Sequence, residues 1–180
     1  MSRIRITGGE WRSRMINVVD APGLRPTPDR VRETLFNWLG RDLSDLRCLD
    51  LFAGSGILGF EAGSCGAAQV TLVEKDRRAF AQLKANAALF NDSRLQPLRA
   101  DALKFAATRV GNDGQGYDLL FLDPPYRQGL LEQMAPLLPK LLNPAARIYA
   151  EAEYELESLG DWGTVKQGKA GQVFYHLLEQ

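Results

Sequence analysis

From residue 47 onward, short apolar runs alternate with longer segments in which apolar residues recur at helical spacing. The runs predict strands over residues 48–52, 70–74, 95–99, 119–123 and 147–150. The segments between them predict helices over residues 57–65, 77–90, 102–110 and 130–142, the last broken at Pro136 and Pro139. This regular alternation predicts an α/β fold in which helices cover both faces of a mostly parallel sheet.

Both ends of the chain depart from this alternation. Polar and apolar side chains alternate near the N-terminus and predict a small hairpin over residues 3–6 and 14–18. A helix over residues 28–39 follows, with Thr27 as its predicted cap. The last predicted elements form an antiparallel hairpin over residues 163–169 and 172–178. We therefore expect a basic N-terminal extension, residues 1–40, packed on a core domain, residues 41–180.

Length and composition limit the class of protein. The chain has 180 residues, 45% of them apolar, which is the size of one domain with its own core. A single histidine, His176, and two cysteines, Cys48 and Cys65, are too few for a metal cage or for histidine-based catalysis. The chain has no N-terminal secretion signal and no window of about 20 apolar residues. These features predict a soluble cytoplasmic protein without a metal.

The net charge of zero, 22 basic against 22 acidic residues, is an average over unlike segments. Residues 1–32 hold seven arginines against three acids. The planar guanidinium group fits phosphates and stacks on bases, so this cluster indicates contact with nucleic acid. From charge alone, a solvated face is an equally good interpretation.

The first predicted strand of the core is followed by a glycine-rich turn. Gly54, Gly56 and Gly59 satisfy the pattern GxGxxG between a strand and a helix, and Glu74 ends the next strand 20 residues after Gly54. Glycines bring backbone amides close to an anion, while a carboxylate on the second strand receives ribose hydroxyls. The turn predicts a nucleoside-type ligand; glycines that serve only a tight turn are the alternative.

Asp50, at the end of the first core strand, distinguishes between two common ligands of such a turn, NAD and S-adenosylmethionine (SAM). A carboxylate there would repel the pyrophosphate of NAD, whereas SAM carries a cationic ammonium and sulfonium. Asp50 therefore favours SAM, with a helix cap or a solvated strand end as its alternative role. Asp101 is placed to meet the adenine amino group, although it would equally well cap the helix that begins at Ala102.

The fourth predicted strand runs into Asp123, Pro124, Pro125 and Tyr126. The two prolines form a rigid, extended turn that presents acceptors, the Asp123 carboxylate and the Pro124 carbonyl. Hydrogen bonds accepted from an exocyclic amino group would make its nitrogen more pyramidal and aim its lone pair at a sulfonium methyl group. Tyr126 would stack on the base. These residues predict methylation of an amino group; a proline-rich strand exit with a packed tyrosine is the alternative.

The motifs DLFAGSG (residues 50–56) and DPPY (residues 123–126), together with Glu74, resemble those of SAM-dependent amino-methyltransferases. The segments GGEWRSR, RPTPDRVRETLFNWL and AGQVFYHL resemble the RsmD family, and the resemblance covers nearly the whole chain. Ser13 stands where that family usually has a second glycine. The resemblance implies methylation of the N2 amino group of one guanine in bacterial 16S ribosomal RNA (rRNA), with SAM as methyl donor.

The resemblance also implies a Rossmann-like, seven-stranded sheet and a set of functional residues. The expected cofactor-binding residues are Asp50, Phe52, Gly54, Gly56, Glu74, Lys75, Asp101, Ala102 and Asp123. The expected catalytic residues are Asp123, Pro124, Pro125 and Tyr126. The arginines expected to contact RNA are Arg3, Arg12, Arg14, Arg25, Arg30 and Arg32. The expected partner is 16S rRNA in the small ribosomal subunit or an assembly intermediate, with no membrane, and the expected state is a monomer.

Three other functions stay open. The methylated group could be adenine N6 or a protein glutamine, although Asp123 favours nucleic acid because asparagine often opens the corresponding motif in glutamine enzymes. A non-catalytic RNA-binding assembly factor would keep the same fold, and an NAD oxidoreductase is disfavoured by Asp50. Outside the site, His176 is expected at the surface or a sheet edge. A solvated strand face is expected for the alternating acids Glu151, Glu153, Glu155 and Glu157.

Overall fold

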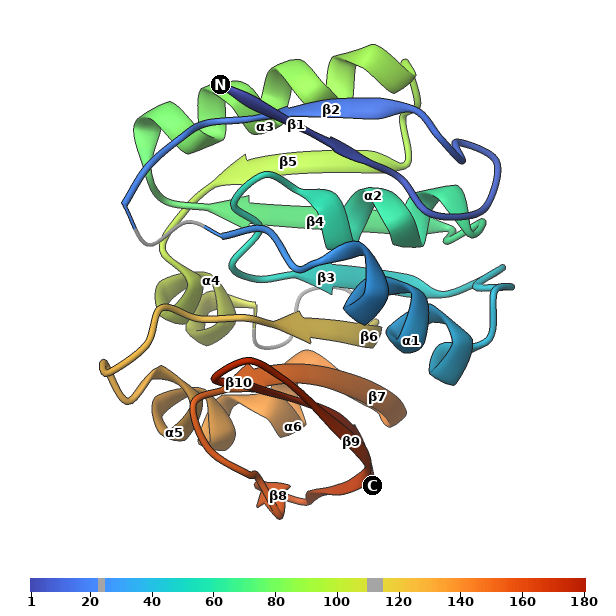
Figure 1. Cartoon of the computed structure of the whole chain (residues 1–180). Helices are drawn as coiled ribbons and strands as arrows, with labels where there is room; N and C mark the ends of the chain where they lie inside the picture. Colours follow the sequence, from blue (N-terminus) through green and yellow to red (C-terminus); the bar gives the residue numbers. More distant parts are fainter. Residues whose placement is uncertain (23–24, 110–114) are drawn as a thin grey trace.

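The computed structural model describes residues 1–22, 25–109 and 115–180 (Figure 1). Within these residues, one sheet has eight strands in the order β5-β4-β3-β6-β7-β10-β9-β8, and β1 pairs separately with β2. The strands are β1 (Ser2–Arg5), β2 (Met15–Val18), β3 (Arg47–Asp50), β4 (Gln69–Glu74), β5 (Leu95–Arg99), β6 (Tyr117–Leu122), β7 (Leu142–Ala152), β8 (Ser158–Leu159), β9 (Trp162–Ala170) and β10 (Val173–Glu179). The helices are α1 (Asp29–Leu39), α2 (Ile57–Ser64), α3 (Arg77–Phe90), α4 (Ala102–Thr108), α5 (Leu130–Met134), the 3-10 turn η1 (Ala135–Leu137) and α6 (Leu138–Leu141). None of these helices has the length and apolar character needed to cross a bilayer.

The strands β3 to β7 pair in parallel, as the alternation of strands and helices predicts. β10, β9 and β8 extend the sheet with antiparallel pairing, and β9 and β10 form the predicted final hairpin. The prediction of seven strands was wrong by one, because β8 also joins the sheet. β8 has only two residues, too few to show an alternating pattern in the sequence.

The chain builds the parallel part of the sheet in two directions from β3. It first passes outward through β4 to β5, and then returns to place β6 on the other side of β3, followed by β7. The arrows of β3, β4, β5 and β6 point the same way in Figure 1, so their carboxyl ends share one edge. The strand order reverses between β3 and β6, and α/β sheets bind ligands at the carboxyl ends beside such a reversal.

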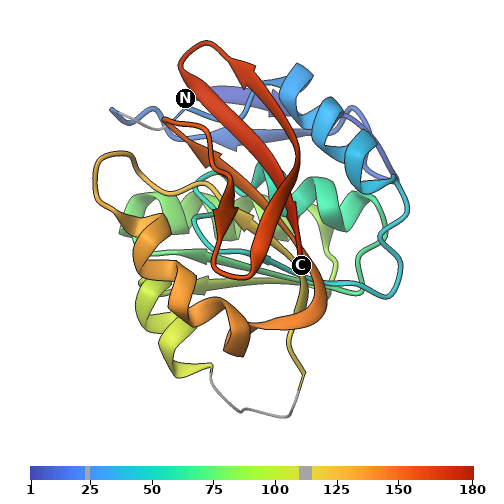
Figure 2. The same ribbon diagram turned by 90° about the horizontal axis from the view of Figure 1, so that it is seen from below.

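Apolar side chains alternate across the central strands and give each face of the sheet a core. Cys48 and Phe121 belong to the core that α1, α2 and α3 cover, whereas Leu49 and Leu120 belong to the core beneath α4, α5 and α6. Figure 2 shows α1 on one side of the sheet and α4 to α6 on the other. With both faces covered, the carboxyl edge is the part of the parallel sheet that is left for a binding site.

The N-terminal hairpin and α1 are built into the first of these cores. Trp11 stacks on Phe90 of α3, with ring centroids 4.4 Å apart. Phe36 of α1 packs against Phe121 of β6, with ring centroids 6.1 Å apart. Apolar residues of the extension and of the α/β domain thus form one continuous cluster. The domain boundary at residue 40 stays a prediction.

The structure also bears on three local expectations about helices. The helix predicted over residues 130–142 is broken into α5, η1 and α6, with one proline in each of the last two, as expected. The predicted end of α4, Val110, lies outside the described residues. Thr27 does not cap α1, because Pro28 occupies the N-cap position and the Thr27 hydroxyl donates to Glu151 Oε1 instead.

His176, expected at the surface or an edge, is fully buried in β10. Its Nε2 accepts a hydrogen bond from the Leu156 N–H at 3.0 Å, so Nδ1 carries the proton that it shares with the Ala150 carbonyl at 3.1 Å. Burial lowers the pKa of His176, which keeps the ring neutral. The expectation was wrong because β10 lies between β7 and β9, with neighbours on both sides.

Candidate active site

Three carboxyl groups from strands that are distant in sequence meet at the carboxyl edge of the sheet. Asp50 ends β3, and the parallel register with β6 brings Asp123 just beyond the same edge. In β7, which pairs with β6 on its other side, the register places Glu151 next to Asp123. The site therefore forms at the reversal of strand order, where the topology leads us to expect it.

The glycine turn lies between β3 and α2, as predicted. Gly54 and Gly56 have φ angles of 54° and 87°, in the left-handed region that favours glycine. A Cβ atom on Gly56 would lie 2.5 Å from Leu83 Cδ1 and 2.6 Å from Phe60 Cε2, so a side chain does not fit there. Glu74, at the end of β4, accepts a hydrogen bond from the Gly54 N–H at 2.9 Å and thereby holds the turn. Backbone conformation and packing together explain the glycine motif.

Asp50 lies directly before this turn and is only 3% exposed. Its Oδ2 accepts a hydrogen bond from the Gly59 N–H of α2 at 3.1 Å. Burial raises the pKa of Asp50 to about 7; the charges of Glu74 and Glu151 add to this effect, and the bond from Gly59 opposes it. A cation next to Asp50 would restore the carboxylate at neutral pH.

The DPPY turn follows β6 and lines a cleft together with the end of β7. Pro124, Pro125, Tyr126 and Glu151 are among the residues that line this cleft. Tyr126 is 40% exposed. Burial and the neighbouring carboxylates raise the pKa of Tyr126 to about 12, so its ring stays neutral. A neutral, half-exposed aromatic ring at a cleft is suited to stacking on a planar base.

Glu151 is a site residue that the alternation of acids did not reveal. The other three acids are exposed as expected, but Glu151 is only 6% exposed, so its part of the predicted solvated face was wrong. Its Oε1 accepts hydrogen bonds from the Tyr149 hydroxyl at 2.7 Å and from the Thr27 hydroxyl at 2.8 Å. The register of β6 and β7 places Glu151 beside Asp123, and its charge helps to raise the pKa of that residue. The available signal was its position at the end of the last parallel strand.

Asp50, Glu74, Asp123 and Glu151 bring four carboxyl groups to this edge. Burial raises the pKa of Asp123 well above its ordinary value, and the charges of Glu151 and Asp50 raise it further. In the described part of the chain, no lysine or arginine forms an ion pair with any of the four. The same residues contain no cluster of histidine, cysteine and acidic side chains suited to a metal ion. An organic cation with a nucleoside part, as in SAM, fits this edge because it supplies the missing positive charge.

The remaining predicted cofactor-binding residues follow β3, β4 and β5, in the loops or, for Ala102, at the start of α4. Phe52 is partly buried and Lys75 is exposed. Asp101 caps α4 through a hydrogen bond from the Lys104 N–H to Oδ1 at 3.1 Å, which is the alternative role that its position allowed. The side chain of Ala102 packs in the core, which leaves only its backbone for contact with a ligand. Ligand contacts of these residues stay predictions.

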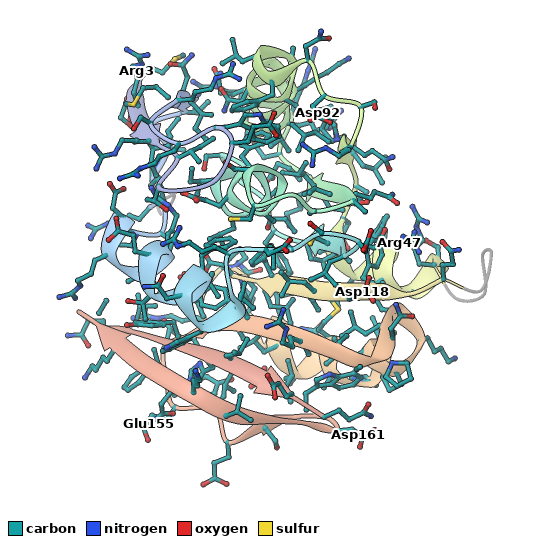
Figure 3. The ribbon with its side chains drawn as sticks, turned by 90° about the vertical axis from the view of Figure 1, so that its right-hand side faces the viewer. Arg3, Arg47, Asp92, Asp118, Glu155 and Asp161 are labelled. Atoms are coloured by element: carbon teal, nitrogen blue, oxygen red, sulfur yellow. The ribbon has the colours of Figure 1, made fainter. Side chains whose placement is uncertain are left out.

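Most of the predicted RNA-binding arginines are exposed on the N-terminal extension, namely Arg3, Arg12, Arg25 and Arg30. Arg14 is exposed as well, but it is anchored by a hydrogen bond to the Leu89 carbonyl at 2.7 Å and by its position 4.4 Å above the Phe90 ring. In Figure 3, Arg3 lies at the opposite end of the molecule from Glu155. The exposed arginines of the extension are therefore available for contact with phosphates.

Arg32 was wrongly predicted to contact RNA, because its side chain is fully buried. It forms ion pairs with Asp29 at 2.7 Å and with Glu61 at 3.4 Å, and it donates to two backbone carbonyls. Arg32 lies three and seven residues before Leu35 and Leu39, so helical spacing already places it on the buried face of α1. Its role is to join α1 to α2 and the hairpin.

Dinucleotide-binding enzymes also have alternating strands and helices and a glycine turn. The buried carboxylate of Asp50 beside the turn, however, suits a cationic cofactor. The class of protein that this fold and this site define is that of the SAM-dependent methyltransferases. The RNA methyltransferase of Salinibacter ruber, solved in complex with S-adenosyl-L-homocysteine, has the same fold, with a TM-score of 0.66 at 16% identity over 86% of this chain and 93% of that one. Within this class, the chain belongs to the RsmD family, described as Conserved hypothetical protein 95, whose family model matches residues 4–179.

Two relatives support this membership along the whole chain. "Ribosomal RNA small subunit methyltransferase D" of Escherichia coli (strain K12) is 45% identical over 183 residues, which cover 99% of this chain and 90% of the relative. The solved structure of the protein yhhF from Escherichia coli has a TM-score of 0.86 at 44% identity and covers 99% of this chain and 98% of its own. The resemblance to the RsmD family is thereby confirmed.

Proposed function

We propose that this chain transfers a methyl group from SAM to the exocyclic N2 amino group of one guanine in 16S rRNA. The observation that carries the proposal is the position of Asp123 and Pro124 at the same sheet edge as the buried Asp50. Acceptors for an amino group thus stand beside a site for a cation. The name of the Escherichia coli relative, "Ribosomal RNA small subunit methyltransferase D", supports small-subunit rRNA as the substrate.

The exocyclic amino group of a base is a poor nucleophile, because its nitrogen lone pair is delocalised into the ring. The Asp123 carboxylate and the Pro124 carbonyl accept hydrogen bonds from its two N–H groups. These bonds direct the nitrogen lone pair away from the two acceptors. SAM supplies the methyl group, which its positive sulfonium makes electrophilic. Tyr126 stacks on the base and holds its plane. The proton that the nitrogen loses passes to the Asp123 carboxylate, whose raised pKa suits it to this role.

The exposed arginines of the N-terminal extension give this site a basic neighbour that can bind the phosphates of a large RNA. Replacing Arg3 and Arg12 together by alanine is expected to flatten the salt dependence of RNA binding. Each phosphate contact on a single strand contributes about 0.7 to the slope of log affinity against log salt, so two lost contacts reduce it by about 1.4. Filter binding of small-subunit rRNA at several salt concentrations measures this slope.

A matched variant separates local contacts from the overall charge. Replacing Lys140 of α6 and Lys166 of β9 by alanine removes the same charge from exposed positions elsewhere, and the slope should stay as in the unchanged protein. Neither variant should alter the melting temperature. Equal flattening in both variants, or a lower melting temperature with an unchanged slope in the arginine variant, would contradict a phosphate-binding role.

Incubation with tritiated SAM and small ribosomal subunits tests the reaction itself. Subunits that lack the modification should incorporate label, and nucleoside analysis should find it in N2-methylguanosine. Label in N6-methyladenosine or in protein glutamine would replace the proposed substrate with one of the alternatives. RNA binding without any label would instead favour a non-catalytic assembly factor.

The same experiment with naked 16S rRNA, assembly intermediates and complete subunits identifies the form of the substrate. All the groups of the site come from one chain, and we propose on this ground that a monomer is active. Sedimentation of the active sample tests this, since activity confined to a dimer would contradict it. Because rRNA is the proposed partner, we place the protein in the cytoplasm.

A further inference from the structure

Glu151 is a buried charged group that the proposed reaction does not yet use. The register of β6 with β7 pairs Leu122 with Ala150, so the next residues of the two strands, Asp123 and Glu151, lie side by side. Glu151 also lines the cleft that Pro124 and Tyr126 line. It therefore reaches the same space as the residues that hold the target base.

The contacts of Glu151 fix its carboxylate in one orientation. The hydroxyls of Thr27 and Tyr149 both donate to Oε1, from the segment before α1 and from β7 itself. Asp123 lies beside Glu151, and burial together with the charge of Glu151 raises the pKa of Asp123, which favours a proton on Asp123 when no base is bound. When that proton passes to solvent and the N–H donors of a base take its place, Asp123 and Glu151 both present acceptors beside the cleft.

The acceptors at this cleft match one base in particular. Guanine presents three donor hydrogens side by side, two on N2 and one on ring N1. Adenine and cytosine carry a ring nitrogen with a lone pair next to their amino group, which a carboxylate repels. The Pro124 carbonyl, Asp123 and Glu151 supply three acceptors from adjacent strand ends. A site whose buried polar groups pair with one substrate discriminates strongly against an analogue that leaves them unpaired.

We propose that Glu151 accepts the ring N1–H of the target guanine and thereby selects guanine over bases that have a lone pair at this position. The inference rests on the proposed function, because it assumes that Asp123 and Pro124 hold the guanine N2 amino group. Glu151 is then a specificity-determining residue supplied by β7, outside both sequence motifs of the site.

The test compares guanine with 2-aminopurine, which keeps the N2 amino group but has a lone pair at N1. The nucleotide mapped by the labelling experiment is replaced by 2-aminopurine in synthetic RNA, and methylation of both RNAs is measured as kcat/KM. For Glu151→Gln, the guanine rate should fall about tenfold to a hundredfold, as for a lost hydrogen bond to a charged group. The amide of glutamine can donate to the 2-aminopurine N1, so the preference for guanine should fall at least about tenfold.

The ratio of the two rates is the decisive readout. 2-Aminopurine also lacks the guanine O6, but this difference affects the unchanged enzyme and the variant alike and cancels when the ratios are compared. A purely structural role for Glu151 predicts equal losses on both RNAs and an unchanged ratio, which would overturn the inference. Glu157→Gln removes an exposed acid of the same alternating series and should leave both rates unchanged.

The proposed function and this inference can fail separately. If the unchanged enzyme does not methylate guanine N2 at all, the proposed function fails, whatever Glu151 does. If it methylates guanine but the ratio is unaffected in Glu151→Gln, only the inference fails. Melting curves and SAM binding show whether the variant is folded. If it is not, Glu151→Asp keeps the charge but shortens the side chain, and the preference for guanine must fall in that variant too.

Discussion

Replacing Asp123 by alanine is expected to lower the single-turnover rate of RNA methylation by at least about 100-fold, the loss seen when an aligned hydrogen-bonding group of a transition state is removed. Asp123 lies beside Glu151, which lines the cleft, whereas the glycine turn is held by Glu74. The affinity for SAM should therefore fall much less than the rate. Rapid-quench methylation assays and calorimetry measure the two quantities on the same protein.

Two further variants sharpen this prediction. Asp123→Asn keeps one acceptor oxygen but cannot take up the proton, so it should lose less activity than Asp123→Ala and more than an exposed control. Asp161→Ala removes an exposed carboxylate at the far end of the molecule from Arg3 and should retain full activity (Figure 3). Equal losses of rate and SAM affinity in Asp123→Ala would show that Asp123 acts mainly as a cofactor ligand.

The parallel part of the fold was predictable because its signals are local and repeated. Apart from β5, each strand from β3 to β7 contains consecutive apolar residues, and the helix predicted over residues 77–90 has the bounds of α3. The glycine turn and the DPPY motif were also visible, because their residue types have few other uses between a strand and a helix. β8 was missed because pairing with β9, a tertiary contact, makes those two residues a strand.

The groups that the sequence did not place correctly are those whose environment depends on distant segments. Glu151 belongs to an alternating acidic series, yet Thr27, 124 residues away, and Tyr149 enclose it. Nothing in residues 151–157 alone distinguishes it from its exposed neighbours. His176 is buried for a related reason, since β10 lies inside the sheet. In both cases tertiary contacts decide burial, and they have only a weak local signal in the sequence.

The error at Arg32 has a different cause, because the sequence contained the signal for burial but the arginine count of the segment outweighed it in the prediction. Its spacing from Leu35 places it on the inward face of α1, but the count of arginines in the same segment favoured a common role on the surface. The buried pair with Glu61 explains how a charge is tolerated there. A group of like residues can thus contain members with unrelated roles, and helical position separates them better than composition does.

Asp50→Asn is expected to stabilise the protein without cofactor at pH 8 while weakening its affinity for SAM. Burial raises the pKa of Asp50 from an ordinary 3.8 to about 7. Stability from a group with a raised pKa is fully present below the ordinary pKa and is lost as the pH rises through the folded-state pKa. Over this window the loss reaches about 4 kcal/mol. Asparagine does not titrate and keeps an acceptor for the Gly59 N–H, so the variant avoids this loss.

The melting temperature of Asp50→Asn should therefore exceed that of the unchanged protein by about 8–16 °C at pH 8, and the difference should shrink toward pH 5. The affinity for SAM should fall about tenfold to a hundredfold, because a charge-assisted contact with the cation is lost. Asp161→Asn, at an exposed position, should show neither effect. A lower melting temperature at pH 8 would contradict the raised pKa, and unchanged SAM affinity would remove Asp50 from the cofactor site. If both expectations hold, Asp50 reduces the stability of the protein without cofactor in exchange for binding a cation at the edge of the sheet.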